Sequence, residues 1–134
     1  MKITKCQGEG QGSCTLCSSH GWWNRHWMAL LSRIEGFDGC YCSDCVEIIK
    51  NAPALKIAPA YFDDVIYGRK KAECRLNDRD FRVGQIYSLR EYDAYYDLFT
   101  GRSVTICITH VLDRFKGLKK GWCVFSFEIL GKDV

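Results

Sequence analysis

Two stretches near the end of the chain alternate between polar and apolar residues, as strands do when they bury one face. These stretches are residues 103–111 and 122–130. Their alternating apolar positions are Val104, Ile106 and Ile108 in the first and Cys123, Phe125, Phe127 and Ile129 in the second. Residues 55–57, 69–76 and 85–91 have shorter patterns of the same kind. The C-terminal part of the chain is therefore predicted to be mainly β-structure.

One helix is predicted between the first two of these strands. Pro59 suits the first turn of a helix, and Gly68 marks its end. Phe62, Val65 and Ile66 have the spacing i, i+3, i+4 and should pack against the strands. A strand, a helix and then further strands predict an α+β fold, a small β-barrel that carries a helix.

The chain before Pro53 has a different composition, rich in cysteine, glycine and tryptophan and with few aliphatic runs. Such a segment buries too little apolar surface to fold without a crosslink. Residues 46–50 have a short helical pattern that stops before Pro53, and residues 22–31 are expected to form a strand or hairpin. We therefore divide the chain into an N-terminal module, residues 1–52, and a barrel domain, residues 53–134.

The N-terminal module contains two CxxC pairs, Cys14 with Cys17 and Cys42 with Cys45. Four thiolates at about 2.3 Å hold a tetrahedral Zn²⁺, and a two-residue spacing lets one tight turn direct both sulfurs at one ion. The second pair precedes a helical pattern, whose N-terminus stabilises thiolates. This layout resembles that of treble-clef zinc fingers. We predict a structural zinc ion held by these four cysteines.

Other side chains offer alternative ligands. They are Cys6, Cys40, His20 and His26, and a set of Cys14, Cys17, Cys40 and Cys45 also stays open. A redox pair, or pairs arising by chance in a cysteine-rich chain, would explain the motifs without a metal. A catalytic zinc would need an open position and a nearby base, and no carboxylate is obviously placed for that role.

Composition limits the compartment and the partners. No apolar stretch suits a signal peptide or a membrane span, so we expect a cytoplasmic protein with no membrane partner. In a reducing compartment the nine cysteines are better explained as thiols and metal ligands than as disulfides. The formal net charge of +3 is too small to argue for a polyanionic partner by itself.

A specific motif, G-x-K-x-x-E-x-R-x-N-D-R-x-F, runs from Gly68 to Phe81. Together with residues 55–57, 89–93 and 117–122, it closely resembles the ASCH superfamily, whose fold is a PUA-like β-barrel. More narrowly, it resembles a branch common in bacteriophage and prophage genomes and catalogued as a domain of unknown function. The zinc-finger module lies outside the resemblance.

The resemblance implies a cleft that binds RNA, single-stranded nucleic acid or a nucleotide. We place Lys70, Glu73 and Arg75 in this cleft, with Arg79 and Arg90 at its rim. The residues that support such a surface are two basic runs and a group of tyrosines: Arg69, Lys70, Lys71, Arg75, Arg79 and Arg82; Arg114, Lys116, Lys119 and Lys120; Tyr87, Tyr92, Tyr95 and Tyr96. A solvated charged face, a tyrosine-rich barrel rim and an ion network closing the barrel mouth are the plainer interpretations. His110 is expected to be a core or cleft-edge histidine.

Two other functions stay open. Some ASCH-type proteins resemble amidohydrolases acting on acylated cytidine, and others have been proposed as ribonucleases. Lys70 matches the lysine of the amidohydrolase pattern, but Glu73 stands where that pattern has a threonine nucleophile, so catalysis would rest on Lys70 and Glu73 as an acid/base pair. Alternatively, Trp22, Trp23 and Trp27 would form an apolar patch that binds a host protein. The sequence fixes neither the enzymatic role nor the oligomeric state.

Overall fold

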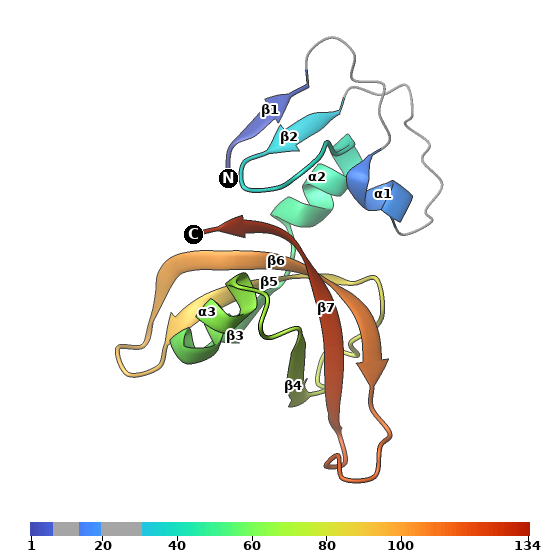
Figure 1. Cartoon of the computed structure of the whole chain (residues 1–134), viewed down its shortest axis with the longest axis vertical. Helices are drawn as coiled ribbons and strands as arrows, with labels where there is room; N and C mark the ends of the chain where they lie inside the picture. The colour runs from blue at the N-terminus through green and yellow to red at the C-terminus, as the bar shows by residue number, and fades with distance from the viewer. Residues whose placement is uncertain (7–13, 20–30) are drawn as a thin grey trace.

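The computed structural model describes residues 1–6, 14–19 and 31–134 and has an α+β fold with a curled five-stranded sheet (Figure 1). An N-terminal unit contains β1 (Ile3–Lys5), α1 (Thr15–Ser19), β2 (Ser32–Ile34) and α2 (Ser43–Lys50). The remaining elements are β3 (Ala54–Ile57), α3 (Pro59–Ile66), β4 (Ala72–Leu76), β5 (Ile86–Asp93), β6 (Leu98–Leu112) and β7 (Trp122–Asp133). Within the described residues, no helix is both long and apolar enough to cross a membrane.

The sheet forms a half-barrel with one open side. Its strand order is β3-β5-β6-β7-β4, in which β3 runs parallel to β5 and the other neighbours are antiparallel. The two edge strands, β3 and β4, are not paired with each other in the described sheet. Backbone groups along both edges therefore face an opening in the barrel wall.

The predicted alternation is confirmed in the barrel core. Val104, Ile106 and Ile108 of β6 are fully buried, as are Cys123 and Phe125 of β7. Helix α3 begins at Pro59 and packs on this core through Phe62 and Val65, which are also fully buried. The predicted face of the helix is therefore the observed one.

Strand β4 begins three residues later than its pattern predicts. The backbone N–H groups of Arg69 and Lys70 both donate to the Asp64 carbonyl, at 2.8 and 2.9 Å, and so complete the end of α3. Gly68, at φ 76°, supplies the left-handed conformation that this helix end requires. The strand can start only after this turn, at Ala72.

The prediction that His110 is a core or cleft-edge histidine is wrong, because His110 is exposed and is not among the residues that line the cleft described below. Ile108 pairs with Phe127, but His110 pairs with Ser126, the very next residue of β7. This register shift is a β-bulge, which inserts an extra residue and ends the strict alternation of faces.

The N-terminal unit packs directly on the barrel. Its buried cluster includes Ile86 of β5 and Cys107 of β6. At the end of β7, Lys132 N donates to the Gly36 carbonyl at 3.1 Å, and the Phe37 ring lies against Gly131. The chain passes from α2 to β3 near the predicted boundary, but the two parts share apolar contacts. The hairpin predicted for residues 22–31 lies almost wholly outside the described residues.

Candidate metal centre and binding cleft

The structure brings four cysteines of the two CxxC pairs together. Cys14 precedes α1 and Cys17 lies within it, while Cys42 is the N-cap of α2 and Cys45 is in its first turn. All four are buried, and their sulfur atoms lie within 4.8 Å of one another. The Cys17 sulfur is 3.7 Å from that of Cys42 and 3.1 Å from that of Cys45. Four thiolates at about 2.3 Å from one ion are about 3.8 Å apart, so the cluster has the right size for zinc.

The chemistry of this donor set also fits a metal ion. Burial raises the pKa of the Cys17 thiol to about 11, and it raises the pKa of Cys45 as well. A buried group of thiolates needs a cation to compensate the loss of water, and a divalent ion supplies that charge. With four protein ligands, a bound ion would have no open position for substrate. The cluster is therefore consistent with a structural zinc ion.

The alternative ligands lie elsewhere or outside the described residues. Cys40 is not in the group of four, and its sulfur lies 2.9 Å from that of Cys6. The Cys40 backbone nevertheless contacts the start of α1, since Thr15 N donates to the Cys40 carbonyl at 2.8 Å. His20 and His26 fall outside the described residues. Cys6 and Cys40 thus form a separate, half-buried pair.

A cleft of about 860 Å³ lies at the open side of the half-barrel, between β3 and β4. Apolar and aromatic side chains line much of it, including Leu55, Ile57, Phe81, Phe99 and Trp122. The charged residues that line it are Lys56, Lys70, Glu73, Arg75, Asp78 and Arg79. A concave, largely apolar surface with a few convergent charges is typical of a small-molecule or base-binding site.

Glu73 is the buried charge of this cleft. It pairs across the sheet with buried Phe125, so its side chain faces the barrel interior and is only 7% exposed. Lys70 Nζ lies 2.8 Å from one carboxylate oxygen, and Arg75 Nε donates to the other at 3.0 Å. A buried carboxylate is stable only with such partners. The structure therefore brings together the three residues that the sequence places in the cleft.

Arg75 also links the two edge strands. Its Nη2 donates to the backbone carbonyl of Lys56 on β3, while its Nε holds Glu73 on its own strand, β4. One side chain thus spans the open side of the half-barrel. A ligand that enters there meets the Arg75 guanidinium.

Of the two residues predicted at the rim of the cleft, the structure places only one there. Arg79 lines the cleft and is exposed, whereas Arg90 does not line it. Arg90 pairs with Lys56 on the outer, exposed face of the sheet and borders a different cavity. Tyr87, one of the four tyrosines proposed to stack on a base, is only 5% exposed and belongs to the barrel core.

Two features near the cleft are not predicted from the sequence: the aromatic side chains that line it and one further ion network. Phe99 and Trp122 are far apart in sequence, and only the curling of the sheet brings both to the cleft. Arg102 donates to both oxygens of buried Glu91, at 2.9 and 2.7 Å, and reaches Asp63 of α3 at 3.1 Å. The hydrogen bonds from Arg102 hold the pKa of Glu91 below its ordinary value. This network fastens α3 to the sheet beside the cleft.

Residues 53–127 match the family described as Domain of unknown function (DUF3850), which is more than half of the chain. The chain belongs to the DUF3850 family. The matched range contains every residue named above as lining the cleft, and it leaves the cysteine cluster outside. The cleft is thus part of the DUF3850 domain, and the four clustered cysteines lie outside it.

The chain is also similar to a bacteriophage protein. The "Uncharacterized 12.9 kDa protein in GpA 3'region" of Escherichia phage P2 is 41% identical over 59 residues. This alignment covers 44% of the chain and 52% of the phage protein, so the chain spans about half the length of this curated relative.

Proposed function

We propose that this DUF3850 protein binds a base or nucleotide of RNA or another single-stranded nucleic acid in the cleft between β3 and β4. The observation that carries the proposal is the buried Glu73 carboxylate, held by Lys70 and Arg75 inside a cavity with aromatic walls. The open five-stranded half-barrel supports the resemblance to ASCH and PUA-like barrels. The similarity to a P2 protein supports a phage-type origin.

The polar groups of the cleft suit the edge of a base. Each oxygen of Glu73 has one cationic partner and keeps further lone-pair directions free to accept another hydrogen bond. An exocyclic amine, such as N4 of cytosine, is a donor that a carboxylate recognises. Arg75 and Lys70 beside it favour a carbonyl oxygen or a phosphate on the same ligand. The cleft thus offers both a hydrogen-bond acceptor and positive charge.

The walls suit the faces of a base. Phe99 and Trp122 present aromatic surface to the cavity, and stacking on such side chains is tolerant of base identity. The volume of about 860 Å³ lies within the range of ordinary ligand pockets. A base needs to be unpaired to enter, which favours single-stranded ligands over duplexes.

Hydrolysis of a modified nucleoside is the second candidate. It is favoured by the 2.8 Å contact between Lys70 and Glu73, the pair that would handle protons. Among the described residues that line the cleft, none is a serine or threonine, so the threonine nucleophile of the amidohydrolase pattern has no counterpart there. Tyr61 and Cys74 are the lining residues that carry a hydroxyl or a thiol. Release of product from acylated cytidine, lost in Lys70→Ala, would establish hydrolysis. A protein-interaction role through Trp22, Trp23 and Trp27 concerns residues outside the described part of the chain.

We further propose that the four clustered cysteines hold zinc as a structural ion. Its place is at the N-terminus of α2, whose other end leads directly into β3 at the cleft. The zinc would stabilise the unit that packs on the barrel, and the cleft would hold the ligand.

Binding is tested by calorimetric titration with nucleoside monophosphates and with short RNA and DNA single strands. Glu73→Gln keeps the shape and removes the charge, and we expect it to weaken binding about tenfold or more because a hydrogen bond to a charged group contributes about 1.5–3 kcal/mol. Arg79→Gln alters an exposed side chain and should weaken binding without affecting the fold. Glu47→Gln, at an exposed position of α2, is the matched control. If neither nucleotides nor single strands bind the wild-type protein, the proposal is wrong.

A further inference from the structure

The excess positive charge of the chain lies in one hairpin. Residues 113–121, which connect β6 and β7, contain a single carboxylate, Asp113, and four cations. The cations are Arg114, Lys116, Lys119 and Lys120. The formal net charge of the whole chain is +3, which equals that of this segment, so all other residues together are balanced. The modest net charge of the whole chain is thus concentrated in this basic hairpin.

The backbone of the hairpin holds these cations outward. Leu118 N donates to the Phe115 carbonyl at 2.9 Å and Trp122 N to the Lys119 carbonyl at 3.0 Å, which closes two successive turns. Gly117 and Gly121, at φ 103° and 86°, occupy the third position of these turns, as in type II turns. The second, corner position of each turn is therefore a lysine. Both corner lysines, like the other two cations, are exposed and form no ion pair within the described part of the chain.

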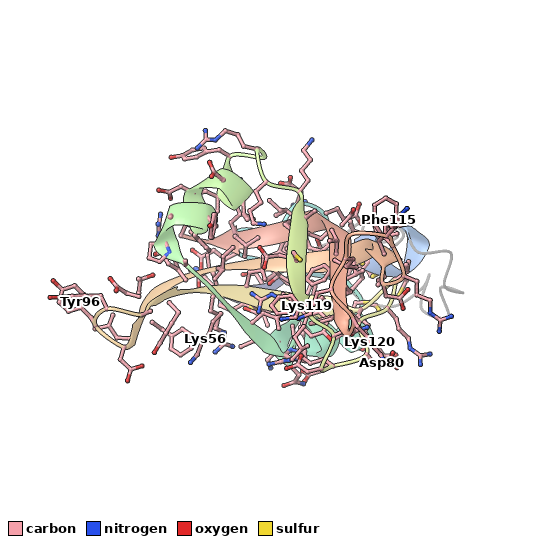
Figure 2. The ribbon with its side chains drawn as sticks, turned by 90° about the horizontal axis from the view of Figure 1, so that it is seen from below. Lys56, Asp80, Tyr96, Phe115, Lys119 and Lys120 are labelled. Atoms are coloured by element: carbon pink, nitrogen blue, oxygen red, sulfur yellow. The ribbon has the colours of Figure 1, made fainter. Side chains whose placement is uncertain are left out.

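The hairpin begins and ends beside the cleft. Asn77, which directly follows β4, donates its backbone N–H to the Gly121 carbonyl at 2.8 Å. The next residue after Gly121 is Trp122, which lines the cleft, as does Arg79. In Figure 1 the hairpin extends from the end of the molecule opposite the N-terminal unit. Figure 2 views the molecule from that end and shows Lys119 and Lys120 on the near side.

We propose that this basic hairpin, residues 113–121, binds the phosphates of a single-stranded nucleic acid whose base occupies the cleft. The inference rests on the proposed function of the cleft and adds a second contact region to it. Exposed cations bind a chain of phosphates favourably, because each contact between a cation and a phosphate releases a condensed counterion. Phe115, 62% exposed among the cations, adds an aromatic face on which an unpaired base can stack.

Fluorescence anisotropy on the full chain tests the hairpin directly. The probes are a labelled mononucleotide and a labelled single strand of roughly 12 nucleotides, a length within the usual site sizes of single-strand binders. The variant is Lys116→Gln/Lys119→Gln/Lys120→Gln. Its matched control is Lys2→Gln/Lys5→Gln/Lys50→Gln, which removes the same charge from exposed lysines of the N-terminal unit. All substitutions are on exposed side chains, and circular dichroism checks that the fold is kept.

We expect the hairpin variant to lose affinity for the single strand and the control to keep it. Three lost phosphate contacts should reduce the slope of log K against log salt by about 2, which corresponds to about 100-fold weaker binding at roughly 0.1 M salt. Binding of the mononucleotide should be nearly unchanged, since it is held in the cleft.

Two results would overturn the hairpin proposal alone, and a third would overturn both proposals. Equal affinity and salt slope in variant and wild type would overturn the hairpin proposal, as would wild-type binding that does not increase from mononucleotide to single strand. In both cases mononucleotide binding would leave the cleft proposal intact. A wild-type protein that binds neither probe would overturn both proposals.

Discussion

Replacing Gly131 with alanine should disrupt the docking of the N-terminal unit on the barrel. A Cβ at this position would lie 2.2 Å from Cγ of Phe37 and 2.3 and 2.5 Å from its two Cδ atoms, while ordinary contact begins at 3.4 Å. Gly131 is not among the glycines with positive φ, so the substitution adds volume without straining the backbone. The Phe37 ring, which also contacts Tyr41 edge-on, must move.

The expected cost follows from this overlap. Overpacking of a well-packed contact typically costs about 1–3 kcal/mol, and we expect Gly131→Ala to lower the free energy of unfolding by about that amount. Urea unfolding of the protein in zinc-containing buffer, followed by tryptophan fluorescence and circular dichroism, measures it by linear extrapolation. Because the N-terminal cluster includes Ile86 and Cys107 of the sheet, both signals should change in one transition.

A double-mutant cycle separates the clash from other effects. In a Phe37→Ala background the added methyl group has no ring to meet, so Gly131→Ala should be neutral or slightly stabilising through a less flexible unfolded chain. A free energy of unfolding unchanged by Gly131→Ala within about 0.5 kcal/mol would show that no such clash exists. An equal cost with and without the Phe37 ring would also contradict a clash with the ring.

Three further predictions concern the metal, the buried ion pair and the edge-strand link. Elemental analysis should find zinc in the purified protein and little in Cys45→Ser, and chelation should lower the thermal midpoint because metal binding is coupled to folding. Glu91 has a pKa lowered by Arg102 from its ordinary value of 4.5, so the stability it adds is complete above that value and is lost as pH falls through the lower native pKa. Glu91→Gln should therefore show a flatter decline in unfolding free energy below about pH 4.5 than wild type, and equal declines would contradict this. Arg75→Met should abolish the link to Lys56, measured as faster amide exchange along β3, whereas unchanged exchange would count against it.

The sequence predicts the barrel best where the signal is local. The alternation of β6 and β7 reports burial directly, and Pro59 and Gly68 bound α3 by backbone geometry alone. The bulge that exposes His110 leaves no mark in the alternation, because an extra residue is visible only against the partner strand. The contact of Phe37 with Gly131 also cannot be predicted from the sequence, because it depends on how two distant segments pack together.

The candidate sites follow the same division. Lys70, Glu73 and Arg75 lie close in sequence on one turn and strand, so the contacts among their side chains can be predicted from their spacing. Arg90 belongs to another stretch of the family resemblance, residues 89–93, and lies on the outer face of β5, which the strand register decides. The aromatic walls need the closure of the whole sheet. The CxxC spacing identifies four cysteines, and the packing of α1 against the start of α2 selects them over Cys40.

We propose that the ligand binds between the edge strands of the half-barrel. Amide NMR spectra of the isotopically labelled protein, recorded during titration with nucleotides and a short single strand, test it most directly. We expect the largest shift changes in β3, in residues 70–79 and at Trp122, with the cysteine cluster little affected. Shift changes confined to the N-terminal unit, or no changes with any nucleotide or single strand, would contradict it.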